Sequence, residues 1–471
     1  MKIDKVIVCL ISMLALAGCM TIFNARMEQL AIEDKASGEE VRKGKLTLTG
    51  CSLEDLVKFA MTNRPSMTVA ALAVIDNRLR LKEIAADAPL VSYSPWTAPS
   101  IGLSGGYSAS SETGKSLKWN TEGNASAGIS LEVLIYDFGR NEALANEQIE
   151  HLISSEYELI SMGYNVFEEV TSAYFSLMES DALLEVAVTN ECEYALHLKQ
   201  AEDRLQAGET HKLDVTRARF DLSHAREMTI AASNRVITAG ATLMKSLGVD
   251  ASRGTRDEVY PASGDALSKV MRGFRSTRYN IDDAFDLART NAPAMAIARA
   301  RLRASSRAVD YAIANLKPSV SAEVSINWMD PLWVWHWGVS AFESLFEGFR
   351  KTTAVDRAVV AMKSASAAVD ETEQQLSLDI ETAISVRDNA AKALETARVS
   401  VLAARENLNM VKARYLEGDA SRVDFTDSVS DLATALGNRV SAFYAGQTAE
   451  ARLFALMGQL PEYNEKVLME K

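Results

Sequence analysis

Two stretches of the chain alternate apolar and polar residues, the period-two pattern of a β-strand with one apolar face. In residues 100–136, SIGLSGGY and NASAGISLEVLI flank a polar, turn-rich segment, which predicts a hairpin with a long loop. In residues 319–346, VSAEVSINW and LWVWHWGVSA are separated only by Met-Asp-Pro. This second stretch predicts a shorter hairpin of the same kind.

The second hairpin carries four tryptophans on its apolar face: Trp328, Trp333, Trp335 and Trp337. Polar residues occupy the opposite face. A membrane β-barrel provides lipid for one face and an aqueous lumen for the other, and indole rings favour the membrane interface. One face of a soluble β-sandwich is the alternative. Because four strands cannot close a barrel and unpaired edges are costly in lipid, a membrane location requires several chains to share one barrel.

Long helices are predicted for most of the remaining chain. From Asn141 to Arg204 there is no proline and only one glycine, and Ile153, Ile160 and Phe167 recur every seven residues. This coiled-coil pattern predicts a helix over about residues 140–205, and a matching segment predicts another over about 350–415. Each helix would extend roughly 96 Å, about three times the hydrocarbon thickness of a bilayer.

Each long helix is followed by a glycine and a second helix. Gly208 and Gly418 are predicted to form helix-hairpin turns. The return helices are predicted over about residues 211–247 and 421–457, antiparallel to the long helices. Shorter helices are predicted before each β-hairpin, so the overall class is mainly α with a small β portion.

The chain contains two repeats. LEDLVKFAMTNRPSM, from Leu53, matches IDDAFDLARTNAPAM, from Ile281, 228 residues later. The turn that ends at Asp214 matches the turn that ends at Asp424, 210 residues later, as LIYDFGR matches SLFEGFR. The missing 18 residues fall between the Asn-x-Pro and the Asp/Glu-x-x-Arg elements. We assign the segments as follows: 52–248, repeat 1; 249–279, an equatorial connecting segment; 280–457, repeat 2; 458–471, a C-terminal equatorial tail.

The N-terminus has the features of a bacterial export signal. Residues 1–18 contain two lysines and an apolar run too short to span a bilayer. Leu16-Ala17-Gly18-Cys19 resembles the lipobox, which implies cleavage before Cys19, a lipid on its sulfur, a lipidated segment over 19–51 and delivery to the outer membrane. A plain secretory signal is the alternative. Cys51 and Cys192 would remain as thiols; a disulfide between them is possible, but we expect two separate buried thiols.

Charge and motifs limit the chemistry. With 50 lysines and arginines against 63 aspartates and glutamates, the formal charge is -13, which would repel nucleic acid. The sequence has no phosphate-binding glycine loop, no catalytic Ser/His/Asp or Cys/His arrangement and no paired-cysteine metal spacing. Cys192 and His197 lie five residues apart on one helix, a spacing that we interpret as helix packing. We therefore expect no enzyme, no cofactor and no metal site.

The order of these elements resembles the TolC-like outer-membrane efflux proteins, in particular their lipoprotein branch. The motifs NRP and NAP, YDFGR and FEGFR, and the two Arg-x3-Gly-x5-Asp turns carry the resemblance over nearly the whole mature chain. It implies a homotrimer with a twelve-stranded β-barrel in the outer membrane and an α-barrel across the periplasm. The trimer would passively conduct substrates from an inner-membrane pump of RND or ABC type through a periplasmic adaptor, or membrane fusion, protein.

The resemblance also implies a gate at the periplasmic tip. Tyr415, Gly418, Asp424 and Asp427 match the family's tip pattern, and Asp214 matches the partner in the first repeat. A bond from Tyr415 or an arginine to Asp214 would hold adjacent helix pairs shut, while the aspartates ring the pore. The chain departs from the pattern by placing Arg422 two residues after the expected arginine position. Alternatively, Asp214 and Asp424 are first-turn acids stabilised by the helix dipole.

Two other functions remain open at this stage. The same architecture serves as the outer-membrane component of type I protein secretion, and a lipid-anchored coiled-coil scaffold would need no pore. The sequence does not identify the cargo, because specificity lies in the pump.

Overall fold

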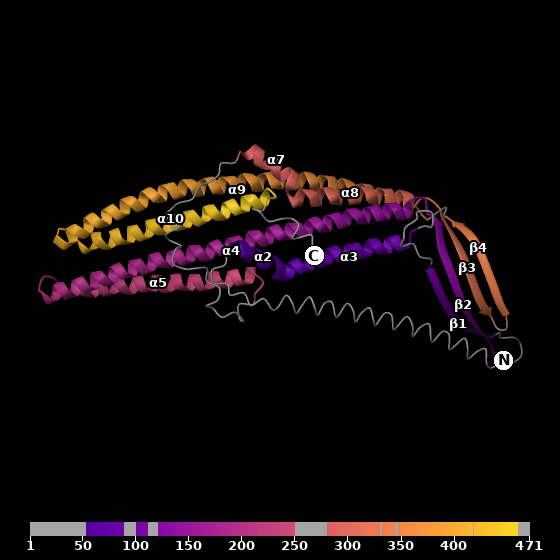
Figure 1. Ribbon diagram of the computed structural model, residues 1–471, viewed down its shortest axis with the longest axis horizontal. Helices are drawn as coiled ribbons and strands as arrows, with labels where there is room; N and C mark the ends of the chain where they lie inside the picture. The colour runs from indigo at the N-terminus through magenta and orange to yellow at the C-terminus, as the bar shows by residue number, and fades with distance from the viewer. Residues whose placement is uncertain are drawn as a thin grey trace.

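The computed structural model describes residues 53–88, 100–111, 121–249, 280–329, 332–343, 347–417 and 419–459. Figure 1 shows an elongated molecule with a β-sheet at one end and two helical hairpins that reach the opposite end. Cys19, Cys51 and Gly418 lie outside the described residues, as do the signal peptide, most of the connecting segment and most of the C-terminal tail.

The two repeats contain the same elements in the same order, which confirms the predicted repeat and fold class. The first consists of α2 (Leu53–Asn63), α3 (Pro65–Ala86), β1 (Ser100–Ser111), β2 (Thr121–Tyr136), α4 (Arg140–Gln206) and α5 (Lys212–Ser246). The second consists of α7 (Ile281–Asn291), α8 (Pro293–Ala314), β3 (Ser319–Met329), β4 (Leu332–Phe342), α9 (Arg350–Glu417) and α10 (Arg422–Leu456). Pro65 and Pro293 begin α3 and α8, positions where the missing N–H has no helical partner.

The four strands form one antiparallel sheet in the order β1-β2-β3-β4. The register aligns Ile129 with Ile326, and Ile326 with Trp335, so the predicted apolar rows share one face. Ser130 and Ser325 are aligned on the opposite face. The pairing of β2 with β3 joins the two repeats in a single sheet.

Each repeat turns from its last strand into its long helix through two consecutive residues in the left-handed region. In the first repeat these are Phe138 (φ 56°) and Gly139 (φ 85°), and in the second Gly348 (φ 62°) and Phe349 (φ 64°). The order of Phe and Gly is reversed between the repeats, yet the backbone follows the same path. Left-handed backbone at phenylalanine costs on the order of 1 kcal/mol, so this turn is imposed by the surrounding elements.

The long helices pack side by side, and each repeat has its own core. α10 lies between α4 and α9, and α5 packs on the other side of α4. The core of the first repeat includes Val57, Phe167 and Leu243, and the core of the second includes Ile380 and Leu453. Within the described residues, no helix combines the length and apolar character needed to cross a membrane. Cys192 is exposed on α4, so the expectation of a buried thiol was wrong.

The repeated Asn-x-Pro element meets the end of the return helix in both repeats. Gly248 follows α5 with a positive φ of 74°, and a Cβ there would lie 3.2 Å from the carbonyl oxygen of Asn63. Gly458 follows α10 with a φ of 68°, and a Cβ there would lie 2.6 Å from the carbonyl oxygen of Asn291. Because each glycine lacks a side chain, the backbone of the Asn-x-Pro element can approach it closely. Any side chain at these two positions would obstruct that approach.

We predict that Gly458→Ala lowers the free energy of unfolding by roughly 2 kcal/mol or more, because it adds left-handed strain to a clash with backbone. The matched control is Gly437→Ala within α10, where the nearest atom to a new Cβ is Leu183 Cδ2 at 3.8 Å. There alanine should stabilise the helix by up to about 1 kcal/mol. Denaturant unfolding followed by circular dichroism measures both; equal effects would contradict the close approach.

Candidate functional site at the hairpin tips

The end of the molecule remote from the sheet is formed by two helix-hairpin turns, α4 to α5 and α9 to α10 (Figure 1). Gly208 has a left-handed φ of 77°, and the Glu209 N–H donates to the Arg204 carbonyl at 2.9 Å. In the second turn the Asp419 N–H donates to the Arg414 carbonyl at 2.8 Å. The same hydrogen bond thus closes both turns, and in the first it accompanies the left-handed Gly208, a common way to end a helix.

The first-turn aspartates stabilise the starts of the return helices. The Asp214 carboxylate accepts a hydrogen bond from the Thr210 hydroxyl at 2.6 Å, which is the main cause of its lowered pKa. Asp424 forms a capping box with Ser421, whose side chain is the main cause of the lowered pKa of Asp424. Both carboxylates are therefore ionised, and Asp424 and Asp427 are exposed.

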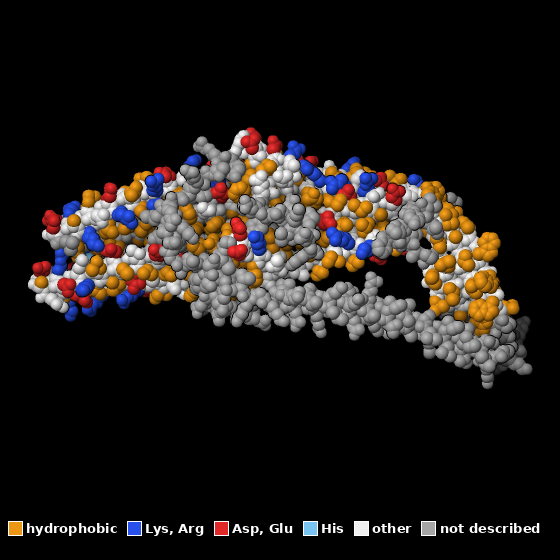
Figure 2. Space-filling view, in the orientation of Figure 1, with side chains coloured by type: hydrophobic (Ala, Val, Ile, Leu, Met, Phe, Trp, Pro, Cys, Tyr) orange, Lys and Arg blue, Asp and Glu red, His pale blue; other side chains and the backbone are white. Residues whose placement is uncertain are grey.

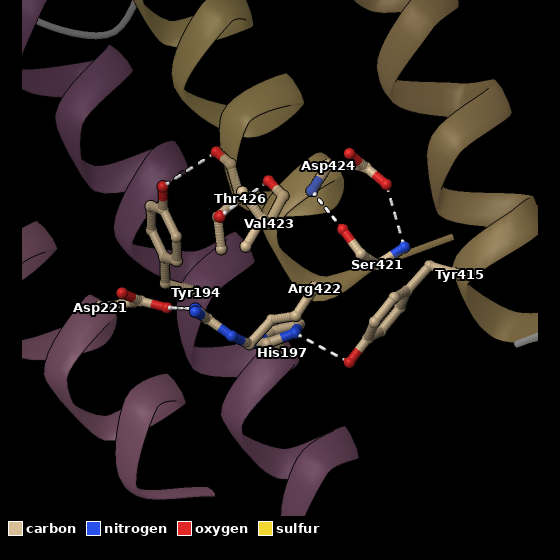
Figure 3. Close-up of polar contacts among 9 residues, drawn as sticks. All are labelled: Tyr194, His197, Asp221, Tyr415, Ser421, Arg422, Val423, Asp424 and Thr426. Carbon is tan, nitrogen blue, oxygen red and sulfur yellow. Dashed lines mark hydrogen bonds and ion pairs between the residues drawn. The ribbon is translucent and has the colours of Figure 1, made fainter. Parts of the chain in front are cut away.

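Tyr415 does not bind Asp214 within the chain; it binds His197 instead. The Tyr415 hydroxyl lies 3.1 Å from Nε2 of His197 (Figure 3). Both rings also stack on Phe425. The Arg204 guanidinium donates to the Tyr415 carbonyl at 3.1 Å and lies 5.0 Å from the centre of its ring. These contacts join α4 to the α9/α10 hairpin.

Arg422 forms an ion pair, with Asp221 of α5 rather than with Asp214. Their closest nitrogen and oxygen are 2.6 Å apart, and the side chains are only 20% and 22% exposed. Two further polar contacts join the hairpins. We call the five together the inter-hairpin links: His197–Tyr415, Arg204–Tyr415, Arg422–Asp221, Lys412–Glu193 (3.0 Å) and Tyr194 to the Thr426 carbonyl (3.3 Å).

Sequence reasoning did not identify His197 or Asp221. One signal was available for Asp221, which lies seven residues after Asp214 and so on the same helical face. No such signal exists for His197, whose partner is 218 residues away. In the part of the chain that the structure describes, no three His, Cys, Asp or Glu side chains converge as metal ligands.

A sequence model of the outer membrane efflux protein family matches residues 59–249 and 284–459, one segment for each repeat. The chain belongs to the outer membrane efflux protein family. This confirms the resemblance inferred from the motifs. No curated protein sequence matches the chain at a significant level.

Solved outer-membrane channels share the fold of this family member. CusC is 17% identical with a TM-score of 0.74, over 88% of this chain and 94% of CusC. VceC of Vibrio cholerae is 15% identical with a TM-score of 0.72, over 86% of this chain and 96% of VceC. CmeC of Campylobacter jejuni is 14% identical with a TM-score of 0.73, over 89% of this chain and 88% of CmeC.

We predict strong coupling between Asp221 and Arg422. Asp221→Asn or Arg422→Gln leaves one largely buried charge without its partner and should lower the free energy of unfolding by about 2–4 kcal/mol. The double variant should lose no more than the worse single variant. Arg219 and Glu202 form the control pair, because they are 66% and 39% exposed and join α4 to α5 within one hairpin. Their coupling in denaturant unfolding should stay below about 1 kcal/mol.

Proposed function

We propose that three copies of the chain form a continuous exit duct from the periplasm through the outer membrane. The observation that carries the proposal is a four-stranded sheet in a chain of the outer membrane efflux protein family. Its edge strands, β1 and β4, pair with no further strand in the part of the chain that the structure describes. Three such sheets supply twelve strands, an even number that closes an antiparallel barrel. Hydrophobic side chains cover much of the visible surface of the sheet (Figure 2), and Trp333, Trp335 and Trp337 are exposed on it. This apolar face would lie against lipid.

The helices extend the duct across the periplasm. α4 and α9 have 67 and 68 residues, so each is roughly 100 Å long. We infer a lipid on Cys19 as a second attachment to the outer membrane. Substrates would enter from an inner-membrane pump through a periplasmic adaptor, and the duct would conduct them passively.

The inter-hairpin links are the proposed closure of the duct. They tie the two hairpins of one chain together at the tip, so widening the tip requires their separation. The Arg422–Asp221 ion pair is the strongest candidate, because it joins the outer helix of one hairpin to the inner helix of the other and is largely shielded from water.

Conductance of the full-length lipidated protein in planar bilayers tests the proposal. The purified protein should be a trimer with low conductance, and Arg422→Gln should raise the conductance severalfold. Glu202→Gln, which breaks a pair within one hairpin, should leave it unchanged. A monomer, or a trimer that does not conduct even with Arg422→Gln, would instead indicate a scaffold without a pore.

We predict that Asp424→Asn with Asp427→Asn reduces the preference for cations, because the proposed trimer places six exposed carboxylates around the tip. Asparagine is chosen because it keeps the helix cap that Asp424 provides. Glu227→Gln, an exposed charge on α5, is the control. Reversal potentials in a salt gradient measure the change; unchanged values would place the two aspartates outside the lumen.

A further inference from the structure

His197 is the most enclosed titratable side chain of the inter-hairpin links. It is 1% exposed, and its ring stacks on Phe425 at 5.0 Å with an interplanar angle of 17°. Nε2 faces the Tyr415 hydroxyl at 3.1 Å. Nδ1 is buried and has no hydrogen-bond partner among the described residues. A histidine so placed is sensitive to any change in its charge.

The groups around His197 come from all four helices of the tip. Arg204 lies on its own helix α4, Tyr415 on α9, Arg422 on α10 and Asp221 on α5. Burial is the largest cause of its lowered pKa; Asp221 acts in the opposite direction, and Arg422 and Arg204 add to the lowering. Asp221 is already engaged in its ion pair with Arg422. The imidazole is therefore neutral at pH 7 and higher.

Protonation would disrupt the favourable contacts that His197 makes in this site. Both ring nitrogens would become donors, so the Tyr415 hydroxyl could no longer donate to Nε2. In the neutral tautomer that accepts from Tyr415, Nδ1 already carries the ring's hydrogen, so the added proton goes to Nε2. The buried ring would then carry a third positive charge beside those of Arg204 and Arg422. Separation of the hairpins would relieve both effects, because water would then solvate the ring.

We propose that His197 is a proton-operated latch: neutral, it binds Tyr415 and helps to hold the two hairpins together, and on taking up a proton it releases them. This inference rests on the proposed function of a duct closed at its tip. It adds a stimulus, external acid, to which the duct itself responds without any partner.

The direction of the response follows from linkage. Because the pKa of His197 is lower in the joined hairpins than in separated ones, its contribution to the closed tip is fully present above the ordinary value of about 6.5. That contribution is lost as the pH falls below this value. Each unit of difference in pKa between the two states changes the ratio of open to closed tips by up to about tenfold for each chain.

The test is the conductance of the full-length protein in planar bilayers at pH 7.5 and pH 5.5. At pH 5.5 Asp214 and Asp424 remain ionised, because their pKa values are lowered from a range already near 4. The open probability of the unaltered protein should rise, by up to about tenfold for each chain. His197→Phe keeps the stacked ring but cannot take up a proton, so its open probability should be equal at the two pH values.

Two further variants separate the latch from general effects of acid. His151→Gln removes an exposed histidine of α4 and should keep the full response. Tyr415→Phe removes the hydroxyl but not the titrating group, so it should conduct more at pH 7.5 and still respond to acid. If His197→Phe does not assemble, His197→Gln serves as the non-titrating variant.

A response that persists in the non-titrating variant, or an unaltered protein that does not respond, overturns the latch. The Arg422→Gln variant distinguishes this failure from that of the proposed function. If Arg422→Gln conducts at both pH values while the unaltered protein shows no response to acid, the proposed duct is supported and the proposed latch is wrong. If no variant conducts at any pH, the duct itself is wrong.

Discussion

The outer edges of β1 and β4 have no strand partner among the described residues, and this is the constraint on which the rest of the structure depends. In lipid every backbone N–H and C=O needs a partner, and one four-stranded sheet cannot provide partners for both of its edges. Closure by further copies, as proposed, would solve this problem for the sheet and would also set the arrangement of the helices. α5 and α9 are the outermost helices of the tip half, and they expose large apolar residues such as Phe220 and Leu402. In the proposed trimer, the neighbouring copies that close the sheet would also cover these helices.

Matched helix lengths follow from the need for both hairpins to end at the same level. α5 and α10 each have 35 residues, and α4 and α9 differ by one, although the repeats share little sequence outside their motifs. The 18-residue difference between the repeats lies between the short helix and the long helix, which are separated by 53 residues in the first repeat (87–139) and by 35 in the second (315–349). Seven of the 18 fall in the loop between the two strands, which has nine residues in the first repeat and two in the second. Loops at the far end of a barrel tolerate such changes because no other element must match their length.

Sequence predicted the elements well because each pattern had one physical solution. Period-two alternation leaves Trp333, Trp335 and Trp337 no choice of face, and a glycine-free and proline-free run such as residues 164–206 can hardly be other than helix. The sequence patterns did not predict which side chains meet between neighbouring helices. Whether Arg422 meets Asp214 or Asp221 depends on which helices are neighbours and on their stagger, which no heptad pattern specifies. The exposure of Cys192 was missed for the same reason.

The nature of the contacts between the hairpins changes along their length. Midway along α4 they are apolar, with Met178 packed against Val440 and Phe443 of α10. At the tip, the apolar clusters mainly unite helices of one hairpin, and the inter-hairpin links are hydrogen bonds and ion pairs. A buried ion pair adds little net stability because desolvation offsets most of its attraction, whereas aliphatic packing adds about 1.5–3 kcal/mol for each side chain buried. In the proposed duct, the tip would therefore separate at a modest cost, and the apolar cluster around Met178 would stay closed and act as the pivot.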